Sequence, residues 1–83
     1  MTTTDELRAT LAEVLADIAP DADLMLVDHD APLNDQVDLD SMDMLTLMER
    51  LGTRAGITIP DRDAPRLQTV NGIVGYLCER LEV

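Results

Sequence analysis

The sequence predicts an all-α protein, a small four-helix bundle of three longer helices plus one short helix, with a long loop between the first and second helices. Two observations support this fold class. Apolar residues recur at helical spacing in three separate segments, and residues that start or end helices stand at the edges of these segments. The chain has 83 residues, enough for one modest core, so we expect a single domain over residues 1–83.

The first helix is predicted over residues 4–18, where aliphatic residues recur three and four positions apart. Thr3 and Glu6 have the spacing of a capping box, which would supply acceptors for free amides of the first turn. Pro20 marks the end of the helix. The apolar stripe consists of Leu7, Leu11, Val14, Leu15 and Ile18.

Residues 19–40 are predicted to form a long loop, because they contain two prolines and seven aspartates without sustained periodicity. Such loops are uncommon in small domains unless they are functional or packed locally. We therefore expect the apolar side chains of this loop to fasten it to the helices. These side chains are Leu24, Leu26, Val27, Leu33, Val37 and Leu39.

The second helix is predicted to begin at Ser41, with Asp40 as its N-cap. Asp43 lies in its first turn, where a carboxylate meets the positive end of the helix dipole. Gly52 is expected to weaken the helix, and Gly56 is placed to end it. The buried stripe consists of Leu47, Met48, Leu51 and Ala55.

The remaining chain is predicted to contain a short helix and a longer one. The segment "ITIPDRDAPRL" begins extended, turns at Pro60 and makes one helical turn before Leu67. Thr69 is placed to cap the last helix. The inner face of that helix consists of Val70, Ile73, Val74, Leu77 and Leu81.

The charge of the chain is strongly acidic, with 17 acidic and 6 basic residues and a formal net charge of −11. This balance repels nucleic acid and anionic membranes, and it favours encounter with a basic protein surface. The first residues, "MTTTDELRAT", lack the pattern of a secretory signal, and no apolar stretch has the length that spans a bilayer. We therefore expect a cytoplasmic protein without membrane insertion.

A calcium loop is the first chemical motif to test, because "DHDAPLNDQVDL" gathers carboxylates in one segment. Counted from Asp28, the calcium-loop pattern requires Asp or Asn, Gly and Glu at its fifth, sixth and twelfth positions. The sequence has Pro32, Leu33 and Leu39 there. The pattern therefore fails, and no metal site is predicted.

Nucleophilic catalysis is also not supported by the residues present. The only histidine, His29, stands in the acidic loop, and an activated nucleophile needs a positioned base. Cys78 stands among apolar neighbours, with Arg80 as the only nearby cation, so we expect a buried or half-buried structural cysteine. The sequence therefore predicts no catalytic residues and no enzyme activity of its own.

Ser41, in "DLDSMD", has two interpretations. It either helps to cap its helix or is a modified serine. A phosphodiester at this position would face free backbone amides and the positive helix end, which favour an anion. Asp40 and Asp43 would oppose that anion, so they fit better as contacts for a basic modifying enzyme.

Three segments together carry a family resemblance: "DSM" at 40–42, "ITIPD" at 57–61 and "TVNGIVGYL" at 69–77. In this order and spacing they resemble the acyl carrier protein family over nearly the whole chain, with Met in place of the usual Leu after the serine. The resemblance implies that Ser41 carries 4′-phosphopantetheine, which a separate magnesium-dependent phosphopantetheinyl transferase attaches from coenzyme A. Acyl groups would then travel as thioesters on this arm between enzymes.

The resemblance also implies a recognition surface at the start and outer face of the second helix, and a monomeric carrier. Partners would be the transferase and acyl-transferring or acyl-modifying enzymes with basic docking surfaces. Arg50, Thr53 and Arg54 follow where fatty-acid carriers tend to keep further acids, so the pathway stays open between fatty-acid, polyketide and specialised biosynthesis. The recognition surface consists of Asp40, Met42, Asp43, Leu45 and Glu49.

Met44 and Ile73 occupy positions where many fatty-acid carriers have smaller residues, so we expect a carried group that is small or polar, or that stays outside the bundle. Two alternatives to an acyl carrier remain. A peptidyl or aminoacyl carrier usually has Gly-Gly-His/Asp-Ser where this chain has "DLDS". An acidic helical interaction module would leave Ser41 unmodified.

Overall fold

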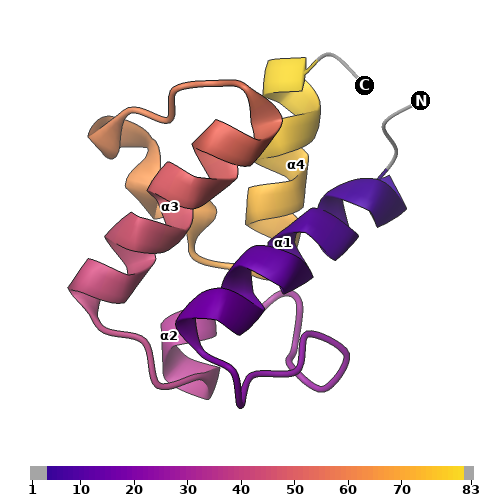
Figure 1. Cartoon of the computed structure of the whole chain (residues 1–83), viewed down its shortest axis with the longest axis vertical. Helices are drawn as coiled ribbons and strands as arrows, with labels where there is room; N and C mark the ends of the chain where they lie inside the picture. Colours follow the sequence, from indigo (N-terminus) through magenta and orange to yellow (C-terminus); the bar gives the residue numbers. More distant parts are fainter. Residues whose placement is uncertain (1–3, 82–83) are drawn as a thin grey trace.

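The computed structural model describes residues 4–81. Over this range the chain consists of helices and their connections, without a strand (Figure 1), and the predicted all-α class is confirmed. The elements are α1 (Thr4–Ile18), α2 (Leu33–Gln36), α3 (Ser41–Ala55), the 3₁₀ helix η1 (Asp61–Leu67) and α4 (Val70–Leu81).

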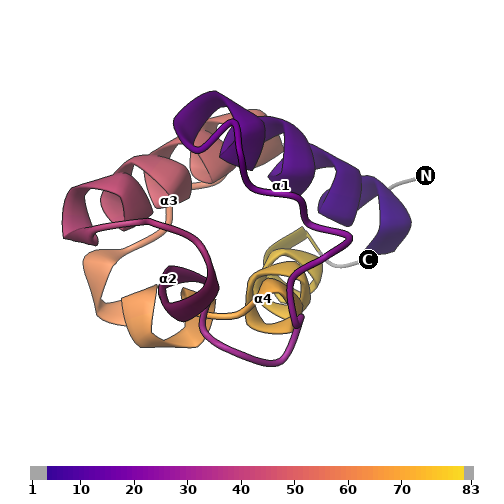
Figure 2. The same ribbon diagram turned by 90° about the horizontal axis from the view of Figure 1, so that it is seen from below.

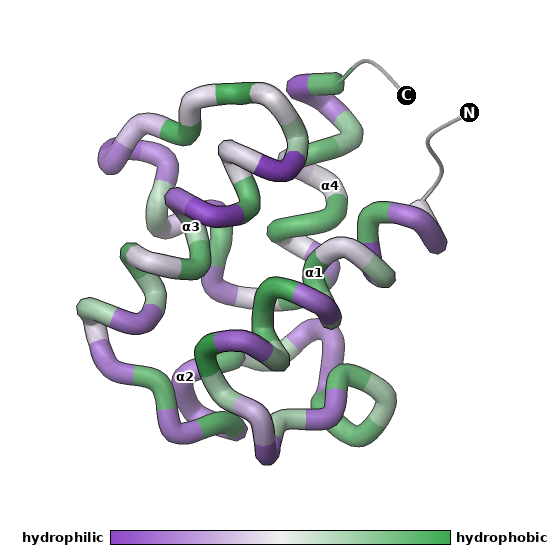
Figure 3. Tube along the Cα trace, in the orientation of Figure 1, coloured by the Kyte–Doolittle hydropathy of each residue, from purple (hydrophilic) through white to green (hydrophobic). Residues whose placement is uncertain are grey.

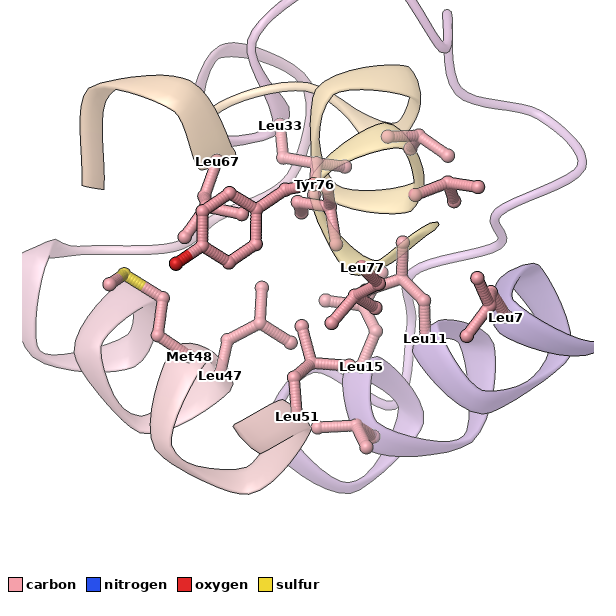
Figure 4. Packing of buried hydrophobic residues seen from close by; sticks show 14 of the residues in the cluster. Leu7, Leu11, Leu15, Leu33, Leu47, Met48, Leu51, Leu67, Tyr76 and Leu77 are labelled. Carbon is pink, nitrogen blue, oxygen red and sulfur yellow. The ribbon is translucent and has the colours of Figure 1, made fainter. Parts of the chain in front are cut away.

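The core lies where the helices meet, since α1 packs against both α3 and α4, and η1 packs against α4 (Figures 1 and 2). Every helix contributes at least one buried apolar side chain, and Figure 4 shows how those of α1, α3 and α4 interdigitate. Ala55 and Leu81 are only partly buried at the edge of this cluster. The buried residues are Leu7, Leu11, Val14, Leu15, Leu33, Leu39, Leu47, Met48, Leu51, Leu67, Val70, Ile73, Val74, Tyr76 and Leu77.

The ends of the longer helices follow the local signals in the sequence. The predicted partner of Glu6 in a capping box, Thr3, lies outside the described residues. At the start of α4, the Thr69 hydroxyl accepts a hydrogen bond from the Gly72 amide at 2.8 Å, as an N-cap does. The predicted cap of the last helix is therefore confirmed.

The segment between α1 and α3 differs from the predicted loop, because it contains α2. The Leu33 amide donates to the Gln68 carbonyl at 2.8 Å, and the Leu33 side chain is fully buried. The Gln36 side chain also accepts a hydrogen bond from the Asp28 amide at 2.6 Å. Gln68 and Asp28 lie outside α2. A helix of only four residues has too little periodicity to be predicted from the sequence.

Leu26 does not fasten the loop to the helices as predicted, since 84% of its surface is exposed. The Met25 amide donates to Asp23 Oδ1, and the Leu26 amide donates to the Asp23 carbonyl, so the chain reverses here. Figure 3 shows this apolar turn on the outside of the molecule. The side chains of Leu24, Val27 and Val37 do pack against the core, and Leu33 and Leu39 are buried.

α3 ends in a Schellman motif, in which Gly56 has a positive φ of 75°. The Ile57 amide donates to the Gly52 carbonyl at 2.9 Å, and the Gly56 amide donates to the Thr53 carbonyl at 3.3 Å. Gly52 is buried, and a Cβ atom there would lie 2.7 Å from the Ile57 carbonyl oxygen. Gly52 therefore permits the close return of the chain, in addition to the predicted weakening of the helix.

Candidate functional site

The site begins where a buried residue leads into an exposed helix end. Leu39 is buried, whereas Asp40 and Ser41 are exposed, so the core fixes the chain immediately before the serine. Ser41 is the first residue of α3, and Figure 1 shows this helix end at the edge of the bundle. It is the only serine in the sequence.

Asp40 caps α3, as predicted. Its Oδ1 accepts a hydrogen bond from the Asp43 amide at 2.8 Å, and its own amide donates to Asp43 Oδ2 at 3.4 Å. The two aspartates thus form a reciprocal capping box with aspartate in both positions. The three-residue spacing was visible in the sequence, but the second bond of the pair was not predicted.

The Ser41 hydroxyl makes none of the described contacts that stabilise the fold. Among residues 4–81, no described hydrogen bond uses it, and Asp40 supplies the cap that one interpretation had given to Ser41. The first amides of a helix have no partner inside the helix, and here Asp40 takes only that of Asp43. The amides of Ser41 and Met42 thus stay available to an anion at this end.

The five residues of the predicted recognition surface lie between the N-cap and the middle of α3, and they differ in exposure. Met42 is 69% exposed and Leu45 is 39% exposed, which makes both apolar side chains accessible beside the serine. Asp40 and Glu49 are exposed, whereas Asp43 is half-buried and engaged in the capping box. Acidic and apolar side chains are thus accessible along this part of α3, and the Asp43 side chain makes the capping box.

The arginines that follow this surface turn toward α1. Arg50 pairs with Asp17 at 3.9 Å, and Arg54 forms both an ion pair and a hydrogen bond with Glu13. All four side chains are largely exposed, so each pair adds little stability. The two pairs do change the surface charge, because they place two positive charges beside the acids of α1, where α1 meets α3.

The positive and negative side chains are concentrated in different parts of the chain. All six arginines stand at position 8 or from position 50 onward, and residues 9–49 contain eleven carboxylates. The described ion pairs join Arg8 to Asp5, Arg50 to Asp17, Arg54 to Glu13 and Arg66 to Glu79. The acids of the loop, α2 and the start of α3 thus have no arginine partner among the described pairs.

No described hydrogen bond joins His29 or Cys78 to Ser41. His29 Nε2 lies 2.9 Å from the Leu24 carbonyl and helps to hold the loop turn. Cys78 is free and half-buried, as predicted. Across residues 4–81, no group of three or more histidine, cysteine, aspartate or glutamate side chains is arranged to hold a metal ion. No helix in that range combines the length and apolar content needed to cross a bilayer.

Comparison with known proteins relates this geometry to one family. The family model described as "Phosphopantetheine attachment site" matches residues 5–77, which contain the whole candidate site. An acyl carrier protein of Renibacterium salmoninarum is 32% identical over 80 residues, covering 93% of this chain and 94% of that protein. Acyl carrier proteins of Rickettsia canadensis and Rickettsia typhi are each 30% identical over 80 residues, covering 96% of this chain and 92% of the relative.

Proposed function

This chain belongs to the acyl carrier protein family, whose model describes a phosphopantetheine attachment site, and we propose that Ser41 is the residue that bears the 4′-phosphopantetheine arm. One observation carries this assignment. Ser41 is exposed at the first position of α3 while Asp40 makes the cap, so the serine hydroxyl is free for chemistry without cost to the helix.

The residues around Ser41 fit a phosphodiester. The amides of Ser41 and Met42 face the end of α3, and the helix dipole places partial positive charge there. The carboxylates of Asp40 and Asp43 oppose an anion, but each accepts a backbone amide hydrogen bond in the capping box. The phosphate would thus lie against the amide side of the helix end.

Attachment uses only the hydroxyl of Ser41. Its oxygen forms a bond to the phosphorus that bears pantetheine in coenzyme A, the adenosine bisphosphate leaves, and the hydroxyl proton passes to a base of the transferase. Once attached, the arm supplies a terminal thiol that holds acyl groups as thioesters. This chain is then the carrier in fatty-acid, polyketide or specialised biosynthesis, and its partner enzymes supply the catalysis.

The test is the intact mass of the purified chain after incubation with coenzyme A, magnesium and a broad-specificity phosphopantetheinyl transferase. The wild type should gain the mass of one phosphopantetheine, and Ser41→Ala should gain none. Circular dichroism of Ser41→Ala should stay helical, because Asp40 remains as the cap.

Thr46→Ala is the matched control, because this hydroxyl lies on the same helix and donates to the Met42 carbonyl. It should load like the wild type. Loading of Ser41→Ala would show that the arm is attached elsewhere. A folded wild type that gains no mass would favour an interaction module with Ser41 unmodified.

A further inference from the structure

A groove lies at the base of the bundle, beside the segment that leads to Ser41. The end of α1, the first part of the following loop and residues 36–38 line a half-open groove of about 500 Å³. Figure 2 shows the helices and loops of these segments from below. The apolar side of the groove is formed by Ile18, Ala19, Ala22, Leu26, Val27 and Val37.

The groove is within reach of Ser41. Asp38 lines it and precedes Ser41 by three residues, which span at most about 11 Å even when fully extended. Leu39 between them is buried, so the distance is fixed by the core. A phosphopantetheine arm is longer than this span, and it can fold back along the segment to bring its thioester to the groove.

The interior between α3 and α4 offers less space for a carried chain. Leu47 is 0% exposed and Ile73 is 1% exposed, and Met44 packs against the same cluster. A chain entering there would displace close-packed side chains. The pocket beside the second half of α3, lined by Met48 and Ile59 among others, encloses about 250 Å³, half the space of the basal groove.

The rim of the groove is acidic. Asp21, Asp23 and Asp38 line it together with the apolar side chains, and none of them has an arginine among the described ion pairs. A carried group that ends in a carboxylate would meet this negative field at close range. An uncharged aliphatic chain would instead cover apolar surface, including that of the exposed Leu26.

We propose that the basal groove binds the acyl group carried on Ser41, and that it takes uncharged aliphatic chains in preference to chains that end in a carboxylate. This proposal rests on the proposed function, since it needs the arm at Ser41. It specifies where the carried group binds if that group stays outside the bundle. The sequence also allowed a small group or a polar group.

The experiment loads the full chain from octanoyl-coenzyme A, and in parallel from the coenzyme A thioester of the eight-carbon dicarboxylic acid. Intact mass first establishes attachment. Amide chemical shifts are then compared with those of the chain bearing the free-thiol arm. The octanoyl group should shift the amide signals of Ala19, Ala22, Val27 and Val37. The amide signals of Leu47 and Ile73 should stay unchanged. The dicarboxylic chain should not shift the amide signals of the groove residues.

Leu26→Asp and Met25→Asp form a matched pair, because the two neighbours are 84% and 87% exposed and only Leu26 lines this groove. Neither change removes a buried contact, so both variants should fold. Leu26→Asp should abolish the octanoyl-dependent groove shifts, and Met25→Asp should retain them.

The outcomes separate the two proposals. A chain that gains no mass would overturn the proposed function and this proposal with it. A loaded chain would overturn this proposal alone if octanoyl shifted Leu47 and Ile73, if it shifted neither region, or if Leu26→Asp left the groove shifts unchanged. Equal groove shifts with the dicarboxylic chain would refute the preference for uncharged cargo.

Discussion

Tyr76 is buried, and its hydroxyl donates a hydrogen bond to Asp63 Oδ2 at 2.7 Å, which joins α4 to η1. Arg80 Nη1 donates to the same tyrosine oxygen at 2.9 Å, and Arg80 Nη2 reaches the Thr58 carbonyl at 3.3 Å. The Arg66 guanidinium lies over the ring, 5.1 Å from its centroid. The only aromatic side chain thus fastens the connection between α3 and α4.

The pH dependence of stability should report this contact. Burial, and then the hydrogen bond to Asp63, raise the pKa of Tyr76 above its ordinary value near 10. The folded state therefore holds the phenolic proton more tightly than the unfolded state. Its contribution is constant below about pH 10 and is lost as the pH rises through the folded pKa, by at most about 1.4 kcal/mol per pH unit.

Tyr76→Phe should remove that alkaline loss, and it should lower the free energy of unfolding at neutral pH by about 1–2 kcal/mol, because Asp63 loses a donor. Urea unfolding at neutral and alkaline pH measures both effects. An alkaline loss of equal size in Tyr76→Phe would assign it to other groups.

Two glycines should respond in opposite directions to alanine. Gly52→Ala should lower the free energy of unfolding by about 1–3 kcal/mol, because its Cβ would meet the Ile57 carbonyl oxygen at 2.7 Å. Gly75→Ala should raise it by about 0.5–1 kcal/mol, since this exposed helical position has no atom within 4 Å of an added Cβ. Thermal unfolding of the pair checks this, and a stabilised Gly52→Ala would contradict the close return of the chain.

Added salt should raise the melting temperature. Eight carboxylates stand between Asp21 and Asp43, and none takes part in a described ion pair, so their repulsion is open to screening. Asp35→Asn should raise the melting temperature at low salt and weaken its salt dependence. The increase should be a few degrees, since about 1 kcal/mol shifts a domain of this size by about 4–8 °C. A flat or falling salt series would show that the native loop already relieves this repulsion.

The charge of the recognition surface should govern the rate of arm attachment. Asp43→Arg is expected to slow it, but this change also breaks the capping box. Glu49→Arg is the cleaner test, because the Glu49 side chain is exposed and appears in none of the described hydrogen bonds or ion pairs. It should slow loading by up to about fivefold, since exposed charge pairs contribute about 0.2–1 kcal/mol.

Asp61→Arg is the matched control for Glu49→Arg, because it makes the same charge change on exposed η1. It should leave loading near the wild-type rate, and added salt should slow the wild type. Equal slowing by both variants would mean that net charge, and not the recognition surface, controls encounter.

Features that depend on neighbours along the chain could be predicted from the sequence. The bounds of α1, the start of α3 at Ser41 and the caps by Asp40 and Thr69 follow from helical periodicity and from hydrogen bonds that close within three or four residues. Ser41 could therefore be identified without the fold, because its place at a helix start between two carboxylates is a local property.

Features whose partners are distant in sequence depend on the tertiary packing and could not be predicted. The Leu33 amide at the start of α2 donates a hydrogen bond to the Gln68 carbonyl. The Arg54 side chain donates to Glu13, and the Tyr76 hydroxyl donates to Asp63. Composition offers many partners for each of these groups, and the packing of α1, α3 and α4 selects one. The same packing closes the core and leaves Leu26 exposed, since an apolar side chain is buried only where another surface is placed to cover it.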